Sequence, residues 1–266
     1  YADQYSIDTD HMGMMGISKG QEAVTRMSDP HNAGTRENSK YEGFPEGTPQ
    51  PQPWQGYPSK IQCGWQGMGA GLWEIEYITK DYAPTILACG ENDNDNVVKD
   101  GTPKFWKKLE ELDVNYIAFY MQGLGHSQSW GYDKRLGIDR YQLVIDFFDR
   151  YLKTADKLPP VVLMATPKDS AENVSPYSKI ALNFAPVIDE KTILENQAIK
   201  VMKVNGKKEV KGTWKMTNGG SKYTFTPEQP FEKNEQYQVT VSTKVKDKAG
   251  TPMAKAKNIR FKVGEV

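Results

Sequence analysis

The chain has 266 residues, enough for one large domain or two ordinary ones. Its 34 basic and 34 acidic residues cancel, so no overall field draws the protein toward nucleic acid or an anionic membrane surface. The apolar runs are as long as strands, and none approaches the roughly 18 residues of a membrane span. Neither a nucleic acid nor a membrane is therefore expected as a partner.

A G-x-S-x-G pattern, GISKG, occupies residues 16–20. This spacing is typical of a serine on a tight turn between a strand and a helix, where flanking side chains would clash and the hydroxyl is pushed out above a sheet. Residues 21–27 are compatible with the helix. The residues before the turn predict a buried, central strand, because several of them are apolar: Ile7, Met12, Met14 and Met15. Ser18 is therefore a candidate nucleophile.

Two later segments predict the partners that a serine nucleophile needs. An apolar run closed by glycine, residues 83–90, comes directly before a cluster of acidic residues. A second apolar run, residues 115–121, comes shortly before His126. In proteins with this kind of turn, an acid and then a histidine follow the serine along the chain, each just past a strand. We therefore expect a carboxylate, the imidazole of His126 and the hydroxyl of Ser18 to meet at one edge of a parallel sheet.

These three segments resemble the α/β-hydrolase superfamily. The resemblance rests on the turn around Ser18, on the acid-bearing strand and loop, and on the Met-Gln-Gly-Leu-Gly-His sequence of residues 121–126, and it covers residues 1 to about 153. It implies a three-layer α/β fold with a parallel sheet. It also implies the chemistry of a serine esterase, thioesterase or peptidase, with no cofactor.

The resemblance also implies roles for individual residues. Ser18 would be the nucleophile, His126 the base, and the Lys19 backbone N–H one half of the oxyanion hole. Asp93 matches the acid position of the family, counted from the glycine that closes the preceding strand. Asp95 is the close alternative.

Aromatic residues accumulate in segments expected near the same sheet edge. Residues 59–63 predict a further buried strand, and the glycine-rich residues 64–73 are expected just beyond its end. The rings are either pocket walls suited to a sugar or aromatic acyl group, or a cover for the end of the sheet. The candidate substrate-binding residues are Trp65, Trp73 and Trp130, with Trp54 and Tyr57 beside them.

The segment from residue 28 to residue 60 is rich in proline and glycine and predicts a long surface loop that could fold over the site as a lid. His31 in this loop is a fallback base. Two packing helices are expected, one beginning at Thr102-Pro103 and one over residues 138–152. The two cysteines predict buried thiols, and no Cys/His cluster has the spacing of a metal site, so no metal is expected.

A change of periodicity near the Leu-Pro-Pro sequence of residues 158–160 predicts a boundary between a first domain, residues 1–157, and a second, residues 158–266. In the second domain, short runs of alternating apolar residues are separated by turn signals, which predicts an all-β sandwich. The runs are residues 180–184, 199–204, 223–226, 237–241 and 259–263. This segment resembles the bacterial Ig-like domains of secreted and surface proteins, which implies a spacer, a wall-facing module or a weak carbohydrate binder.

The sequence begins at Tyr1, with neither a start methionine nor a visible signal peptide, and only about ten residues precede the G-x-S-x-G turn. A complete α/β-hydrolase needs several strands before that turn, including a loop that donates one oxyanion N–H. We therefore expect a C-terminal portion of a longer protein that needs the N-terminal part of its hydrolase domain as a partner and is nearly inactive alone.

The expected function is that of a secreted or cell-surface bacterial carboxylesterase, acting on a small-molecule ester or an acylated polysaccharide. A serine peptidase of the prolyl-oligopeptidase type is the alternative that uses the same chemistry. The turn also resembles some acyl-CoA thioesterase relatives. The alternative from another class is a non-catalytic binding or scaffold protein with a degenerate hydrolase portion.

Overall fold

The computed structural model describes residues 2–29, 61–68, 75, 78–153 and 158–265. Within that part of the chain, no helix combines the length and the apolar character needed to cross a bilayer. The predicted lid, the fallback base His31 and the aromatic residues Trp54, Tyr57 and Trp73 lie outside the described residues.

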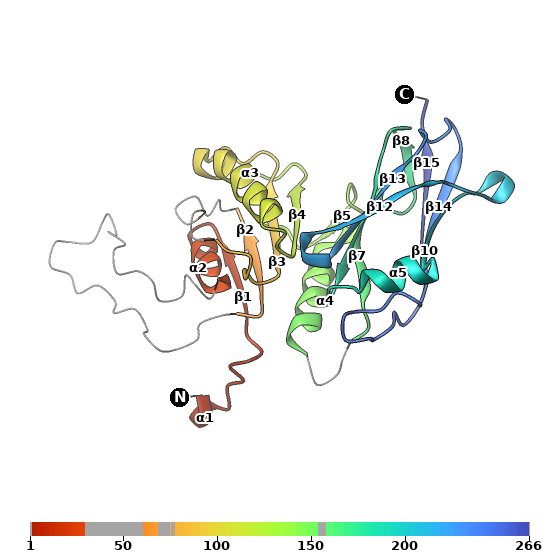
Figure 1. Ribbon diagram of the computed structural model, residues 1–266. Coiled ribbons are helices and arrows are strands. Elements are labelled where there is room, and N and C mark those ends of the chain that lie inside the picture. The colour runs from red at the N-terminus through yellow and green to blue at the C-terminus, as the bar shows by residue number, and fades with distance from the viewer. Residues whose placement is uncertain (1, 30–60, 69–74, 76–77, 154–157, 266) are drawn as a thin grey trace.

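A sheet of four parallel strands forms the centre of the N-terminal part (Figure 1). Its strands follow one another in sequence order: β1 (Gly13–Ile17), β2 (Cys63–Gly67), β3 (Thr85–Gly90) and β4 (Tyr116–Met121). Because all four run in the same direction, the segments that leave them emerge along one edge of the sheet. That edge carries Ser18, the acidic loop and His126.

Helices cover both faces of this sheet. Two of them, α2 (Lys19–Ser28) and α3 (Asn96–Glu111), pack on one face, where Leu87 of β3 meets Phe105 and Leu109 of α3. The third, α4 (Arg140–Leu152), packs on the other face, with Phe147 against Trp65. The result is three layers, helix, sheet and helix. The short elements are α1 (Ala2–Tyr5), β5 (Tyr132–Asp133) and β6 (Ile138–Asp139).

The first strand differs from its prediction. The apolar residues before Ser18 predicted a buried central strand, but β1 lies at the edge of the sheet and pairs with β2 alone among the described strands. Met15 and Ile17 are 46% and 44% exposed, and Met12 is 42% exposed. An apolar run indicates a strand but not its position in the sheet, because that position depends on pairing with distant segments.

Two further predicted boundaries are wrong. β2 begins at Cys63 and includes Trp65, where the prediction had a strand over residues 59–63 and a loop after it. α3 begins at Asn96, so Pro103 lies inside the helix and not at its start. The start is fixed instead by Asp95, whose Oδ1 accepts the Val98 N–H at 3.4 Å. A proline in the interior removes one backbone hydrogen bond, and the apolar packing of α3 outweighs that loss.

The C-terminal part is a sandwich of two sheets, so the all-β prediction is confirmed. One sheet has the order β11-β10-β14-β15-β8 and the other β12-β13-β9-β7. The strands are β7 (Val161–Thr166), β8 (Ala171–Val174), β9 (Ile180–Ala185), β10 (Ile199–Lys203), β11 (Lys208–Glu209), β12 (Gly212–Thr217), β13 (Lys222–Pro227), β14 (Gln236–Val241) and β15 (Lys257–Val263). The helical elements are α5 (Glu190–Asn196), η2 (Asn205–Lys207) and η3 (Asn218–Gly220).

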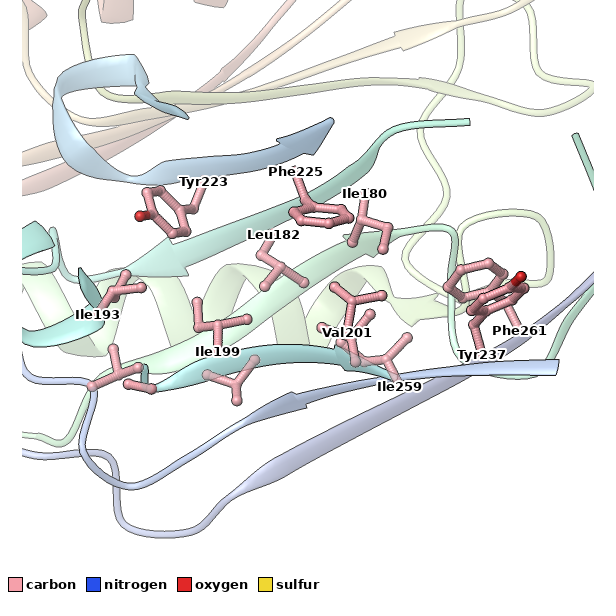
Figure 2. Packing of buried hydrophobic residues seen from close by; sticks show 14 of the residues in the cluster. Ile180, Leu182, Ile193, Ile199, Val201, Tyr223, Phe225, Tyr237, Ile259 and Phe261 are labelled. Carbon is pink, nitrogen blue, oxygen red and sulfur yellow. The ribbon is translucent and has the colours of Figure 1, made fainter. Parts of the chain in front are cut away.

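The sandwich holds its own apolar core between the two sheets (Figure 2). Leu182 and Phe225 come from the four-stranded sheet and meet Ile199, Val201 and Ile259 from the five-stranded sheet. Alternate residues of each strand point inward, which is why the runs with a period of two found these strands in the sequence. The predicted runs did not include β7, β8, β11, β12 or α5; β7 is apolar at nearly every position, and β8 and β11 are short.

The two parts of the chain share buried contacts. Helix α4 packs against β2 on one side and against β7 and β9 on the other (Figure 1). Met164 and Ala185 of the sandwich belong to the same apolar cluster as Phe147 of α4. Asn218 of η3 donates from Nδ2 to the Tyr116 carbonyl at 3.0 Å. The parts therefore meet through a packed surface, while the exact boundary at residue 157 stays a prediction.

Candidate active site

The backbone at Ser18 has an unusual conformation. Its φ of 54° and ψ of −121° lie outside the regions that a serine normally occupies, between the end of β1 and the start of α2. Two hydrogen bonds hold it there: the Ser18 N–H donates to the Gly67 carbonyl at 2.9 Å, and its own carbonyl accepts the Gln21 N–H at 2.9 Å. Such strain persists only where the surroundings enforce it, and it commonly accompanies functional sites.

The two glycines beside Ser18 differ in their roles. A Cβ on Gly16 would lie 2.2 Å from the Gly20 carbonyl oxygen, so no larger residue fits without displacing the backbone. A Cβ on Gly20 would have no neighbour within 4 Å. The predicted need for glycine on steric grounds therefore holds at Gly16 and is wrong at Gly20.

The structure brings the serine, the histidine and one aspartate together. His126 Nε2 lies 2.9 Å from Ser18 Oγ, although the two residues are 108 positions apart in the sequence. His126 Nδ1 lies 2.9 Å from Asp93 Oδ2. The side chain of Asp93 is only 2% exposed and that of His126 is 37% exposed. With the Nδ1–H donated to the carboxylate, Nε2 is left as the acceptor that faces the serine hydroxyl.

Asp93, and not Asp95, pairs with the histidine. The Asp95 carboxylate instead caps α3, as described above. The second carboxylate oxygen of Asp93 accepts the Asp95 N–H at 3.0 Å, which fixes the plane of the carboxylate. Each of the two aspartates thus has a separate structural task.

The loops that carry Asp93 and His126 are interlocked. The Asn92 N–H donates to the Leu124 carbonyl at 2.8 Å. A Cβ on Gly90 would lie 2.0 Å from the Gly125 carbonyl oxygen, so glycine is needed where the two loops cross. This close crossing sets the short distance between the carboxylate and the imidazole.

Lys19 is the first residue of α2 and directly follows Ser18. The first N–H groups of a helix have no partner within the helix, so the Lys19 N–H is available to an anionic oxygen beside the serine. Its ammonium side chain is 92% exposed and lies 4.0 Å from Glu22. Only the backbone of Lys19 is therefore placed to act on a bound substrate.

Of the aromatic residues predicted to line a pocket, the structure describes Trp65 and Trp130. Trp65 is 1% exposed, and its ring packs in the core beneath the sheet edge, so its prediction as a substrate-binding residue is wrong. Trp130 is 37% exposed, and its ring centroid lies 5.1 Å from that of Trp65. Trp130 remains the one described tryptophan of the three that a substrate could contact.

Sequence reasoning missed a buried polar network beneath Ser18. Gln21 Nε2 donates to Gln66 Oε1 at 2.8 Å, and Gln66 Nε2 donates to the Tyr82 hydroxyl at 2.7 Å and to Thr85 Oγ1 at 3.1 Å. Both glutamines are at most 2% exposed. The network ties the first turn of α2 to β2.

Replacing Gln21 with alanine is expected to lower the free energy of unfolding by about 1–3 kcal/mol, because the buried Gln66 carbonyl loses its shorter hydrogen bond and keeps the one from Thr25 Oγ1 at 3.1 Å. Urea unfolding followed by circular dichroism measures this. Gln142→Ala on the exposed surface of α4 is the matched control, and a loss of the same size there would contradict the special role of the network.

Gln128 is a second residue near the site that the sequence did not single out. Its Oε1 is buried and has no hydrogen-bond partner within the described part of the chain. The same atom lies 3.2 Å from the position that a Cβ on Gly67 would take, and the Gly67 carbonyl holds Ser18. A lone glutamine in a polar loop gives no sequence signal of such a placement.

The described residues contain no cluster of metal-ligand side chains, and two cavities in this part of the chain lie away from Ser18. Among the described residues, no three His, Cys, Asp or Glu side chains gather as metal ligands would. Cys63 and Cys89 are free and buried, and burial raises the pKa of the Cys63 thiol to about 12. Two cavities of about 470 Å³ each lie where the N-terminal part meets the sandwich, and no residue of the Ser18–His126–Asp93 constellation lines either of them.

Two family models match this chain, one after the other. Residues 66–155 match the prolyl oligopeptidase family, and residues 156–263 match the bacterial Ig-like domain. The first match contains Asp93 and His126, while Ser18 lies before it. It supports a serine hydrolase-like family for this segment, and both ester and peptide substrates are compatible with it. Bacterial Ig-like domains of the second kind occur in surface or extracellular proteins.

Solved structures show distant likeness only. The S-layer protein rSbsC is 13% identical with a TM-score of 0.33, and the match covers 63% of this chain and 20% of that one. Alpha-2-macroglobulin from Escherichia coli is 16% identical with a TM-score of 0.33, covering 43% of this chain and 34% of that one. The copper resistance protein PcoC from Escherichia coli is 19% identical with a TM-score of 0.29, covering 37% and 94%. No curated protein matches the sequence significantly.

Proposed function

We propose that this protein is a serine hydrolase that works by acyl transfer, with Ser18 as nucleophile, His126 as general base and Asp93 as the orienting acid. The observation that carries the proposal is the continuous pair of 2.9 Å contacts from Ser18 Oγ through the imidazole to the buried carboxylate. Three residues from three separate loops meet in the order of donor and acceptor that nucleophilic catalysis requires.

The proposed reaction begins with attack of Ser18 Oγ on the carbonyl carbon of the substrate while His126 Nε2 takes the hydroxyl proton. Asp93 stabilises the imidazolium that forms. The negative oxygen of the tetrahedral intermediate lies at the N-terminus of α2, where the Lys19 N–H donates to it. His126 then gives the proton to the leaving group, which departs and leaves the acyl group on Ser18 Oγ. A water molecule attacks the acyl carbon while the same imidazole takes its proton, and that proton passes to Ser18 Oγ as the bond to the acyl group breaks.

Two substrate classes are candidates. The match to the prolyl oligopeptidase family favours a peptide bond. A carboxylic ester on an acylated polysaccharide is favoured by the attached Ig-like domain, which suits a secreted or cell-surface bacterial protein, and by the exposed ring of Trp130. The two differ in the leaving group, an amine or an alcohol, and not in the residues that act on the carbonyl.

A further strand beside β1 is part of the proposal. Met15 and Ile17 are exposed apolar side chains on an edge strand that ends at the nucleophile, and upstream strands of the hydrolase domain would cover them. Those strands would also bring the second donor of the oxyanion hole. The loss of one such donor typically lowers the rate by about 10²–10³, so the chain without them is expected to turn over substrate slowly.

A fluorophosphonate probe tests the proposal, because it reacts with an activated serine and stays attached. After digestion with trypsin, tandem mass spectrometry is expected to find the adduct on Ser18 in the peptide of residues 1–19, which also contains Ser6 as an internal control. Heat-denatured protein should not react. An unlabelled Ser18, or labelling that survives denaturation, would overturn the assignment. Inhibition of probe labelling by acetylated xylan or by proline-containing dipeptide amides then distinguishes an ester substrate from a peptide substrate.

A further inference from the structure

A charged pair joins the loop that carries the acid to the loop that carries the histidine. Glu91 Oε2 accepts the Gly123 N–H at 3.2 Å, and Gly123 lies three residues before His126. Glu91 Oε1 accepts from Arg135 Nη1 at 2.7 Å. We propose that Glu91 and Arg135 are positioning residues that hold His126 in line with Ser18. This inference rests on the proposed function.

The guanidinium of Arg135 contacts the strand from which the histidine loop, residues 122–126, departs, and it contacts Glu91. Its Nη2 donates to the Tyr120 carbonyl at 2.5 Å, near the end of β4 from which the loop departs. Through Glu91 it also reaches Gly123 within the loop. A planar guanidinium presents its donors in a fixed fork, so it sets the relative position of the two acceptors in a way that a lysine ammonium cannot.

The backbone of Arg135 is itself held in place. Asp133 Oδ1 accepts the N–H groups of Arg135 and Leu136, both at 2.9 Å. Asp133 Oδ2 accepts from Arg140 Nη2 at 2.8 Å, at the start of α4. The Arg135 side chain therefore extends from a fixed turn. Because it contacts Glu91, the position of the histidine loop depends on the position of α4.

The charge of Glu91 favours this arrangement. The hydrogen bond from the Gly123 N–H, and then the one from Arg135, hold the pKa of Glu91 below its usual range. The side chains of Glu91 and Arg135 are 41% and 38% exposed. Exposed ion pairs contribute little to the stability of a fold. An effect of this pair on reaction rate, without an equal effect on unfolding, is therefore the mark of a positioning role.

Saturation kinetics of fluorophosphonate labelling on the full chain separate positioning from binding. Glu91→Gln and Arg135→Gln are each expected to lower the maximal rate of labelling about tenfold, less than the roughly 100-fold loss that follows a 1 Å misplacement. The half-saturating probe concentration and the urea midpoint should stay close to those of the wild type. The maximal labelling rate of the double variant should be no lower than that of the slower single variant. Arg135→Lys should label at a rate between those of the wild type and Arg135→Gln. Glu111→Gln, which breaks the exposed pair with Lys107 on α3, is the matched control.

Hydrogen exchange supplies a readout that does not need catalysis. The Gly123 amide is expected to exchange faster in Glu91→Gln, since it loses the carboxylate acceptor. Faster exchange in Glu91→Gln, found together with a wild type that never labels, would support the structural linkage and overturn only the acyl-transfer function. Unchanged exchange together with an unchanged labelling rate would overturn the inference. So would a rise in the half-saturating concentration at an unchanged maximal rate, because the pair would then serve binding.

Discussion

Asp93→Asn is expected to slow covalent labelling of Ser18 by about 10⁴-fold, the loss that follows when a triad acid becomes an amide in serine proteases. The Asp93 carboxylate accepts the His126 Nδ1–H at 2.9 Å and so leaves Nε2 unprotonated toward the serine. An asparagine presents an N–H₂ group as readily as a carbonyl, which favours the tautomer with its proton on Nε2. The second-order rate constant for fluorophosphonate labelling measures the loss.

Asp95→Asn is the matched control, because Asp95 is the other acidic candidate in the same loop. Asparagine also caps helices well, so α3 should keep its start and the labelling rate should stay within a few-fold of the wild type. Equal losses in the two variants would mean that the loop as a whole, and not the Asp93 contact, matters. A loss below tenfold for Asp93→Asn would contradict the triad.

Asp133→Ala is expected to lower the free energy of unfolding by about 3–5 kcal/mol, the usual cost of leaving one member of a buried ion pair alone. The side chains of Asp133 and Arg140 are 1% and 9% exposed, and their contact is 2.8 Å long. Within the described residues Arg140 Nε has no partner, so removal of the carboxylate leaves the buried guanidinium with the Ser129 carbonyl as its one remaining acceptor there. Equilibrium unfolding in urea measures the change.

The double variant Asp133→Ala/Arg140→Met should recover part of that loss, since no unpaired charge then remains buried. Glu111→Ala on the surface of α3 serves as the control and should cost less than about 1 kcal/mol. Burial alone would raise the pKa of Asp133, but hydrogen bonds from Arg140 and from the Leu136 N–H outweigh it and lower the pKa below its usual value of 3.8. Stabilisation by the carboxylate is therefore present above about pH 4 and is lost as the pH falls through the native pKa. A penalty for Asp133→Ala that stays constant from pH 7 to pH 2 would contradict this.

Local chemistry made some parts of the site predictable from the sequence. The turn at Ser18 needs glycine at position 16 because the Gly20 carbonyl occupies the space of a Cβ there, and the G-x-S-x-G pattern includes that glycine. The acid and the histidine could be placed near Ser18 because all three residues follow strands that end at the same edge of a parallel sheet. The choice between Asp93 and Asp95 stayed open in the sequence, since both follow the same strand, and only the helix cap at Asp95 decides which one faces His126.

Features that depend on distant pairing could not be predicted in this way. The edge position of β1 follows from which strands pair with it, and nothing within residues 13–17 states that. Trp65 looked like a pocket wall because its glycine neighbours suggested a loop, yet Gly64 and Gly67 lie in β2, and a Cβ on Gly67 would lie 2.3 Å from the Trp65 ring. Glu91 and Arg135 are 44 residues apart, and single charged residues in polar loops carry no sequence signal of a contact.

The hydrogen bonds at the outer side of β4 determine how this sheet can grow. Alternate residues of a strand turn their carbonyls to the same side, so Tyr116 and Tyr120 both face away from β3. The side chain of Asn218 already bonds the Tyr116 carbonyl, and Arg135 bonds the Tyr120 carbonyl, so two of the outward-facing carbonyls of β4 are already paired. Among the described strands the other margin of the sheet is β1, whose last residue, Ile17, directly precedes Ser18, so a strand added at that margin would lie beside the nucleophile.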